Sequence, residues 1–196
     1  MKNRSKKKWV LKFAVVAVFC ILFVSAPFLL RTFVVQAFKI PSGARKPTLL
    51  VGDHILVNKL PQTTDQIERG DIIVFQYPPD PRKDFIKRVV GLPGDLFEIR
   101  DKEIYVNNNP FKEGYVIHTD KNIIPAGVRP RDNFGPISIP ENSLFVLGDN
   151  RDASFDSRFW GFVDLSKVKG KVTKIYWSWD KENSQVRWDR IGQTVH

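Results

Sequence analysis

The chain has 196 residues, of which 42% are hydrophobic, 27% are charged and one is a cysteine. This composition is typical of one or two small domains with a hydrophobic core, and it excludes a disordered chain and a disulfide scaffold. The formal net charge of +10 is typical of proteins that bind either nucleic acid or an anionic membrane. Six basic residues lie among the first twelve positions, which contain no acid, so much of the excess belongs to a short tail, residues 1–12.

The tail is followed by an apolar run, residues 13–30, which is bounded by Lys12 and Arg31. As a helix rising about 1.5 Å per residue, a run of this length just spans the hydrocarbon core of a bilayer. A cleavable secretory signal is the alternative, because Val24-Ser25-Ala26 has the small-residue pattern that precedes a signal-peptide cleavage site. Cleavage there would place Pro27 in an extended protease cleft, which its fixed φ and tertiary amide fit badly. We therefore expect a retained transmembrane anchor.

The distribution of basic residues predicts the orientation of this anchor. Positive charge is concentrated before the run and only Arg31 and Lys39 follow it closely, so the positive-inside rule places the N-terminus in the cytoplasm. Residues 31–196 then form the extracytoplasmic domain of a single-pass membrane protein. Cys20 lies within the apolar run, so no disulfide is expected in the exported part. Nucleic acid is not an expected partner, because the remaining basic residues are interleaved with acids and face the wrong compartment.

After the anchor, short runs rich in valine, isoleucine and phenylalanine are separated by proline, glycine, asparagine and aspartate. The runs are HILVNK, DIIVFQY, FIKRVVG, LFEIR, EIYVN, SLFVLGD, KVTKIYWSW and VRWDRIG. This spacing predicts an all-β domain. Alternation of apolar and polar residues in 96–100 and 103–107 predicts a hairpin with a two-residue link. Residues 108–140 are richer in proline, glycine, asparagine and charge, which indicates a loop-rich insertion.

Three tryptophans near the C-terminus, Trp177, Trp179 and Trp188, occur in strand-like alternation. We expect at least one of them in the core of the domain. The alternative is contact with lipid, because tryptophan favours the headgroup zone and the anchor holds the domain close to a bilayer.

Three segments place polar groups beside tight-turn residues, and they span residues 38–53, 85–95 and 147–161. In the second segment, apolar residues on both faces of a strand predict that Lys87 or Arg88 points inward. A desolvated lysine loses its proton more readily and can act as a general base near neutral pH without a histidine. A strand lysine that extends its amine to solvent is the alternative.

The third segment contains carboxylates and arginines in close succession, namely Asp149, Arg151, Asp152, Asp156 and Arg158. A calcium loop is not expected, because the glycine needed at the sixth position of such a loop is absent and the arginines neutralise the carboxylates. Asp156 and Arg158, with the hydroxyl of Ser154, instead predict a hydrogen-bonded support for a neighbouring site. A plain structural salt bridge is the alternative.

The three histidines, His54, His118 and His196, are scattered and suggest neither a catalytic triad nor a metal site. We expect no metal and no cofactor.

Together, the three segments resemble one family, the bacterial type I signal peptidases, membrane-anchored serine proteases that cut signal peptides from exported proteins. The shared features are the N-terminal anchor, a Pro-Ser-Gly segment, Lys-Arg-Val-Val-Gly-Leu-Pro-Gly-Asp, and Gly-Asp-Asn-Arg-Asp-x-Ser-x-Asp-Ser-Arg-x-Trp-Gly. The resemblance covers nearly the whole chain. It implies a mainly β fold, with one transmembrane helix followed by a domain of coiled antiparallel sheets, in the bacterial cytoplasmic membrane.

The resemblance also implies roles for individual residues. Lys87 is the general base of a Ser/Lys dyad, and Ser42 lends its hydroxyl to the oxyanion hole. Ser154 orients the lysine amine, while Asp156 and Arg158 buttress it. The partners are the signal peptides of secretory preproteins, cleaved after small residues, and the lipid bilayer.

The chain departs from the family motif Pro-Ser-x-Ser-Met-x-Pro-Thr-Leu at the nucleophile. The second serine is Ala44 here, and the following methionine is Arg45. Alanine has no oxygen to attack a carbonyl, so we expect the chain as written to be catalytically disabled. Ser42 does not replace the lost hydroxyl, because two residues of extended strand separate the positions by about 6 to 7 Å. Thr48 lies beyond Pro47 and is a weaker candidate still.

Three hypotheses follow. The first is a signal peptidase I whose nucleophile has been altered, and the second is a natural non-catalytic relative that binds signal peptides or regulates an active paralogue. Replacement of two adjacent residues favours the second hypothesis, since a substrate trap needs only the serine replaced. The third is a structural β domain with no peptide binding, against which the retained Lys87, Ser154, Asp156 and Arg158 argue.

Overall fold

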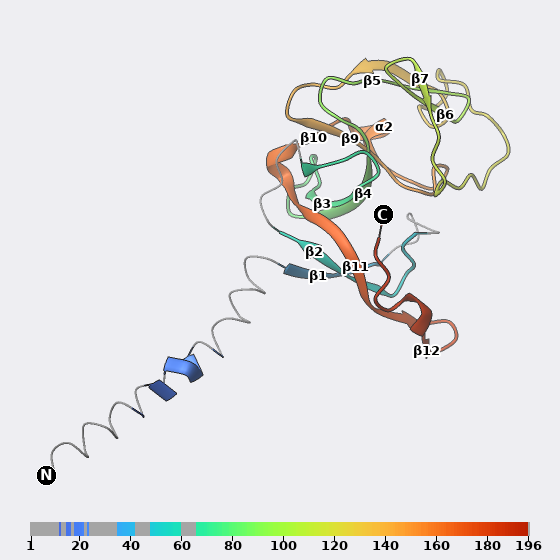
Figure 1. Ribbon diagram of the computed structural model, residues 1–196. Helices are drawn as coiled ribbons and strands as arrows, with labels where there is room; N and C mark the ends of the chain where they lie inside the picture. Colours follow the sequence, from blue (N-terminus) through green and yellow to red (C-terminus); the bar gives the residue numbers. More distant parts are fainter. Residues whose placement is uncertain are drawn as a thin grey trace, which may run out of the picture. The chain divides into compact units, whose positions relative to one another are not determined.

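The structure is a computed structural model, and it describes only part of the chain. The described residues are 12, 15–16, 18–21, 23, 35–41, 48–59 and 66–195. The chain divides into two compact units, Met1–Gln36 and Ala37–His196. In the first unit the described residues before β1 are helical and exposed (Figure 1). Among the residues described, no helix is both long enough and apolar enough to cross a membrane. Most of the expected anchor, residues 13–30, lies outside them.

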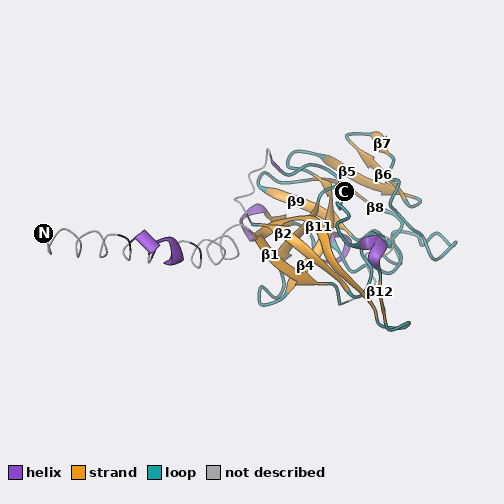
Figure 2. Ribbon diagram, turned by 60° about the horizontal axis from the view of Figure 1, so that its bottom comes forward, coloured by secondary structure: helices purple, strands orange, loops and turns teal. Residues whose placement is uncertain are grey.

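The described strands form two sheets (Figure 2). The larger has the order β1 (Val35–Lys39), β2 (Asp53–Asn58), β11 (Val168–Asp180), β3 (Ile72–Gln76), β4 (Asp84–Gly91), β9 (Ser143–Leu147) and β10 (Val163–Asp164), with β12 (Gln185–Val186) paired to β11. The smaller has the order β7 (Asn109–Phe111), β6 (Glu103–Val106), β5 (Leu96–Arg100) and β8 (Phe134–Ser138). Short helical turns are α2 (Ser157–Trp160), η2 (Leu165–Lys167) and η3 (Trp188–Arg190). The predicted mainly β, antiparallel fold is confirmed.

The central strand β3 has a continuous apolar sequence because both of its faces are covered. Ile72 and Val74 pack into one buried cluster, whereas Ile73 and Phe75 pack into another. Successive side chains of a strand point to opposite faces, so a strand between two cores has no polar face. A third cluster, built around Phe97, joins the smaller sheet to β9. Both faces of the paired strands β3 and β4 are therefore packed against buried apolar side chains.

The long strand β11 runs along the larger sheet towards β12 (Figure 1). It pairs with β3 through its first residues and with β2 through the rest, and its register shifts at three places. Gly170 is required at one of them, because its φ is +156° and a Cβ there would lie 2.1 Å from the carbonyl oxygen of Asn58. These register shifts allow the single strand β11 to pair with both β2 and β3.

The hairpin predicted at residues 96–107 is confirmed. Strands β5 and β6 pair in antiparallel register, and the two linking residues, Asp101 and Lys102, both have positive φ. This is the backbone of a two-residue turn that matches strand twist, formed here without glycine. Beyond β7, residues 112–133 contain no strand of the two sheets among the described residues, and an isolated parallel bridge joins Ile117 to Asn150.

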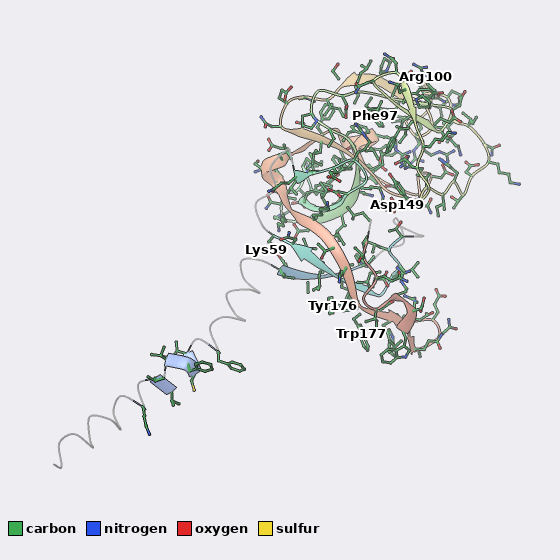
Figure 3. The ribbon with its side chains drawn as sticks, viewed as in Figure 1. Lys59, Phe97, Arg100, Asp149, Tyr176 and Trp177 are labelled. Carbon is green, nitrogen blue, oxygen red and sulfur yellow. The ribbon has the colours of Figure 1, made fainter. Side chains whose placement is uncertain are left out.

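The expectation that a tryptophan of the C-terminal group lies in the core is wrong. Trp177, Trp179 and Trp188 are 37%, 40% and 73% exposed. The register of β11 shifts between Ile175 and Trp177, so that Ile175 and Ser178 face inward and the tryptophans face outward. The ring centroids of Trp177 and Trp188 are 6.2 Å apart. Figure 3 shows Tyr176 and Trp177 at the end of β11, far from Arg100.

Candidate active site

The candidate site is built on β4, between β3 and β9. Lys87 pairs with Ile73 on one side, and Arg88 pairs with Leu147 on the other. The sequence predicted that one of the two cations points inward. Both are buried, with exposures of 5% for Lys87 and 0% for Arg88. Each burial is possible because each cation has polar partners inside the fold.

Lys87 is hydrogen-bonded to a side chain that lies 67 positions later in the sequence. Its Nζ donates to Oγ of Ser154 at 2.7 Å, and both residues are buried. Besides Arg158, the charge of Lys87 and the hydroxyl of Ser154 both lower the pKa of the buried Asp156 carboxylate. The structure thus brings together an amine, a hydroxyl and a carboxylate that can fix the orientation of the amine and exchange a proton with a group beside it.

The carboxylate of Asp156 is held by a bidentate arginine. Nε and Nη2 of Arg158 donate to its two oxygens, each at 2.8 Å, and the backbone N–H of Gly148 donates at 3.2 Å. The same guanidinium donates to the carbonyl oxygens of Arg131 and Arg151, each at 2.7 Å. Burial alone would raise the pKa of Asp156, but the charge and hydrogen bonds of Arg158 outweigh it and hold this pKa below its usual value.

This shift predicts a pH dependence of stability. Because the pKa of Asp156 is lower in the folded than in the unfolded chain, the ionised carboxylate stabilises the fold above its ordinary pKa. That stabilisation is lost as the pH falls through the lowered value. We expect Asp156→Asn to destabilise the chain by about 3 kcal/mol at pH 7 and to flatten the acid decline of its melting temperature. Thermal unfolding from pH 7 downwards checks this, with exposed Asp189→Asn as the control, and an unchanged acid decline contradicts it.

Arg88, on the opposite face of β4, forms a second buried ion pair. Its Nε and Nη2 donate to the carboxylate of Asp149 at 2.8 and 2.9 Å. It also donates to the carbonyl oxygen of Gly70 at 2.6 Å and to Oγ1 of Thr48 at 3.2 Å. The hydroxyl of Thr48, which the sequence ranked as a weak substitute nucleophile, is therefore an acceptor from Arg88.

A tyrosine from the 108–140 segment covers Arg88. The guanidinium carbon lies 3.7 Å from the ring centroid of Tyr115, and the tyrosine hydroxyl donates to Glu113 at 2.7 Å. Glu113 also accepts from Nη2 of Arg151 at 2.6 Å. Burial and the charge of Glu113 raise the pKa of Tyr115, so the phenol stays neutral. Sequence reasoning missed Tyr115 and Glu113, because this segment carries no periodic pattern that would place them beside β4.

The carboxylates of the third segment bind different cations. Asp149 binds Arg88, Asp152 lies 3.3 Å from Nζ of Lys102, and Asp156 binds Arg158. In the part of the chain that the structure describes, no group of three histidines, cysteines or carboxylates could hold a metal ion.

Ser42 and Ala44 lie outside the described residues, but the chain on either side of them is fixed. Ile40 is buried and its N–H donates to the carbonyl oxygen of Asp53 at 2.9 Å. On the other side, Nη2 of Arg190 donates to the carbonyl oxygen of Thr48 at 2.9 Å and to the Asp53 carboxylate at 2.6 Å. The two ends are therefore held at β2 and by Arg190, and the Thr48 side chain also accepts a hydrogen bond from Arg88 of β4.

Comparison with known proteins gives consistent matches. The family described as "Signal peptidase, peptidase S26" matches residues 7–177. A probable signal peptidase I-2 of Synechocystis is 36% identical, with 76% of this chain matched to 66% of that protein. Signal peptidase I of Leptolyngbya laminosa is 37% identical over 76% of this chain and 71% of its own length. A crystal structure of a signal peptidase I from Enterococcus faecalis is 34% identical over 55% of this chain and 97% of that chain, with a TM-score of 0.44.

The chain belongs to the signal peptidase family, since the family match extends over most of its length. The family and the enzyme class predicted from the three motif segments are thus confirmed. The chain spans about two thirds of the length of the Synechocystis relative.

Proposed function

We propose that this chain recognises the signal peptides of exported polypeptides as a signal peptidase I, and that its altered nucleophile position prevents it from cleaving them. The observation that carries the proposal is a buried group of side chains, in which Lys87 is bound to Ser154 and Asp156 is bound to Arg158. In it, Lys87 is the general base, Ser154 orients its amine, and Asp156 with Arg158 buttresses both. A β domain with a purely structural role does not require a buried lysine amine that is bound to a serine hydroxyl.

The chemistry is that of a Ser/Lys dyad once the hydroxyl is restored at position 44. In the Ala44→Ser form, neutral Nζ of Lys87 takes the hydroxyl proton while the oxygen attacks the substrate carbonyl carbon, and Ser42 donates to the developing oxyanion. The protonated amine then gives its proton to the leaving nitrogen as the peptide bond breaks. Water, deprotonated by the same amine, hydrolyses the acyl-enzyme. With Ala44 there is no attacking oxygen, so a bound substrate stays intact.

The substrate is expected to lie extended against the strand edge near residues 41–44. Backbone hydrogen bonds to such an edge supply affinity without regard to sequence, and shallow pockets select the small side chains at the two recognition positions before the cleavage site.

A second candidate function is that of a natural non-catalytic relative, which binds signal peptides or regulates an active paralogue. The observation that favours it is the replacement of two neighbouring residues, because Arg45 adds a cation directly beside the altered nucleophile position in the sequence.

The proposal extends to the membrane. Residues 1–12 are the cytoplasmic tail, 13–30 the anchor and 31–196 the extracytoplasmic domain, with a small insertion at 108–140. The exposed tryptophans at the end of β11 support a second contact with lipid besides the anchor, because amphipathic rings favour the headgroup zone.

We expect Trp177 and Trp188 to touch lipid. In liposomes, lipids brominated on their acyl chains should quench the emission of the full chain more than that of its Trp177→Phe, Trp188→Phe variant. Both proteins keep Trp160, which packs against Phe75, as an internal reference. Equal quenching of the two proteins contradicts the contact.

The function is tested by restoring the nucleophile. A signal-peptide substrate with alanine at both recognition positions is incubated in detergent or liposomes with the chain as written and with its Ala44→Ser, Arg45→Met form. We expect cleavage by the restored form only. Cleavage by the chain as written would show that another hydroxyl attacks, with Ser42 the first to test by alanine substitution.

Cleavage by neither form, with both folded and both binding the peptide, would favour the non-catalytic relative. The matched control is the single Ala44→Ser form, which retains Arg45. If it folds but cleaves more slowly than the double form, the cation at position 45 is itself inhibitory.

A further inference from the structure

A large apolar side chain is exposed directly beside the residue that binds the Lys87 amine. Ser154 and Asp156 are buried, whereas Phe155, between them, is 51% exposed. The exposed fraction of Phe155 places much of its ring at the surface, beside two buried neighbours. Phe155 takes no part in the chemistry assigned to its two neighbours.

Phe155 is the exposed member of an aromatic array from three parts of the chain. We call this array the aromatic ledge, and its members are Tyr77, Phe85, Phe155 and Phe159. The rings of Phe155 and Phe159 are stacked with centroids 5.4 Å apart, and Phe155 meets the ring of Tyr77 at 6.4 Å. Tyr77 is stacked on Phe85 at 4.2 Å. The ledge is therefore continuous from the exposed ring to Phe85.

The ledge reaches the strand that carries the proposed general base. Phe85 precedes Lys87 by two residues on β4, and residues two apart on a strand share a face. At the other end, Ser154 next to Phe155 binds the Lys87 amine at 2.7 Å. One end of the ledge is thus two residues along β4 from Lys87, and the other end is next in sequence to the serine that binds its amine. We infer that a polypeptide bound at the candidate site passes beside the ledge.

The ledge is suited to binding apolar side chains. A single exposed apolar residue is ordinary on a protein surface. Phe155 differs because neighbouring rings already hold it in place, so little conformational entropy is lost when a ligand covers it. Arg129 lies 5.1 Å from the ring centroid of Phe159 and places a cation at the rim. Ring faces of this kind bind aromatic and large aliphatic side chains, which gain contact area and aromatic pairing.

We propose that the aromatic ledge is a specificity-determining surface, which binds one large apolar or aromatic side chain of the substrate polypeptide outside the two small-residue positions. The inference rests on the proposed function, because it takes the occupant to be the same polypeptide. It adds a preference that the small-residue pockets do not provide.

The chain as written allows a direct test, because without the nucleophile it should hold a peptide intact. The full chain in detergent is titrated with fluorescein-labelled signal peptides, and binding is followed by fluorescence anisotropy. The parent peptide has alanine at the two recognition positions and serine at the neighbouring ones, and each serine in turn is replaced by phenylalanine. At one position we expect phenylalanine to tighten binding about three- to tenfold.

The variant Phe155→Ser should lose this gain and bind the parent peptide as the unchanged chain does. Phe155→Leu should retain part of the gain, because it keeps an apolar surface. The matched control is Ile123→Ser, because Ile123 is also 51% exposed but lies in the segment between β7 and β8. Equal melting temperatures show that the variants are folded.

The outcomes separate this inference from the proposed function. If peptides bind but phenylalanine at every position gives no gain, or a gain that survives Phe155→Ser, the ledge does not select substrate and only this inference is overturned. If Phe155→Ser changes self-association or lipid binding and leaves every peptide affinity unchanged, the occupant is wrong and the inference is likewise overturned. If no peptide binds, both proposals fall.

Discussion

Lys87→Ala, introduced into the Ala44→Ser, Arg45→Met form, should lower kcat for signal-peptide cleavage by about 10²- to 10⁴-fold. The reason is that Lys87 is the basic side chain bound to Ser154, and the hydroxyl at position 44 needs a base to take its proton. The measurement is cleavage of the alanine-containing substrate over time, with the melting temperature recorded for each variant.

Two further variants sharpen this result. Lys87→Arg keeps a positive charge but does not release its proton near neutral pH, so it should be as inactive as Lys87→Ala. Lys112→Ala removes an exposed lysine of the same domain and should leave kcat unchanged. Activity retained by Lys87→Ala would show that the base has been assigned to the wrong residue.

Arg88→Ala should lower the free energy of unfolding by about 3–5 kcal/mol, because it leaves the Asp149 carboxylate buried without its guanidinium. Both side chains of this pair are fully buried. The comparison is Arg100→Ala, which removes the exposed partner of a surface pair with Glu98 and should lower the free energy of unfolding far less. Figure 3 labels Arg100 and Asp149, and the Asp149 side chain is fully buried whereas that of Arg100 is exposed.

Denaturant unfolding of the two variants and of Asp149→Ala measures the difference. Because Arg88 and Asp149 are direct partners, the double variant should lose clearly less than the sum of the two single losses. Equal and small losses for Arg88→Ala and Arg100→Ala would mean that the buried pair contributes no more than a surface pair.

Local sequence patterns predicted the strands well, because burial on one or two faces imposes a period of two. The run in β3 and the hairpin of β5 and β6 are such cases. The tryptophans show where this reasoning fails. A period of two does not say which face is buried, and the register shift between Ile175 and Trp177 turned the aromatic face outward.

The candidate site was only partly predictable. The motif segments identified Lys87, Ser154, Asp156 and Arg158 through the resemblance, and the structure buries all four, with Lys87 bound to Ser154 and Arg158 bound to Asp156. Tyr115 could not be found in this way, because its contact with Arg88 depends on how an irregular segment folds back over β4. Contacts of this kind depend on the tertiary arrangement and leave no periodic trace in the sequence.

The contacts of Arg190 with Thr48 and Asp53 depend on the order in which the chain is made. Arg190 holds the carbonyl of Thr48 from 142 positions further along the chain, and it holds the Asp53 carboxylate as well. Contacts between such distant positions form only after both partners have emerged from the ribosome. The support at Thr48 and Asp53 is therefore completed only after Arg190 has been made. A nascent chain that stops short of Arg190 lacks this support.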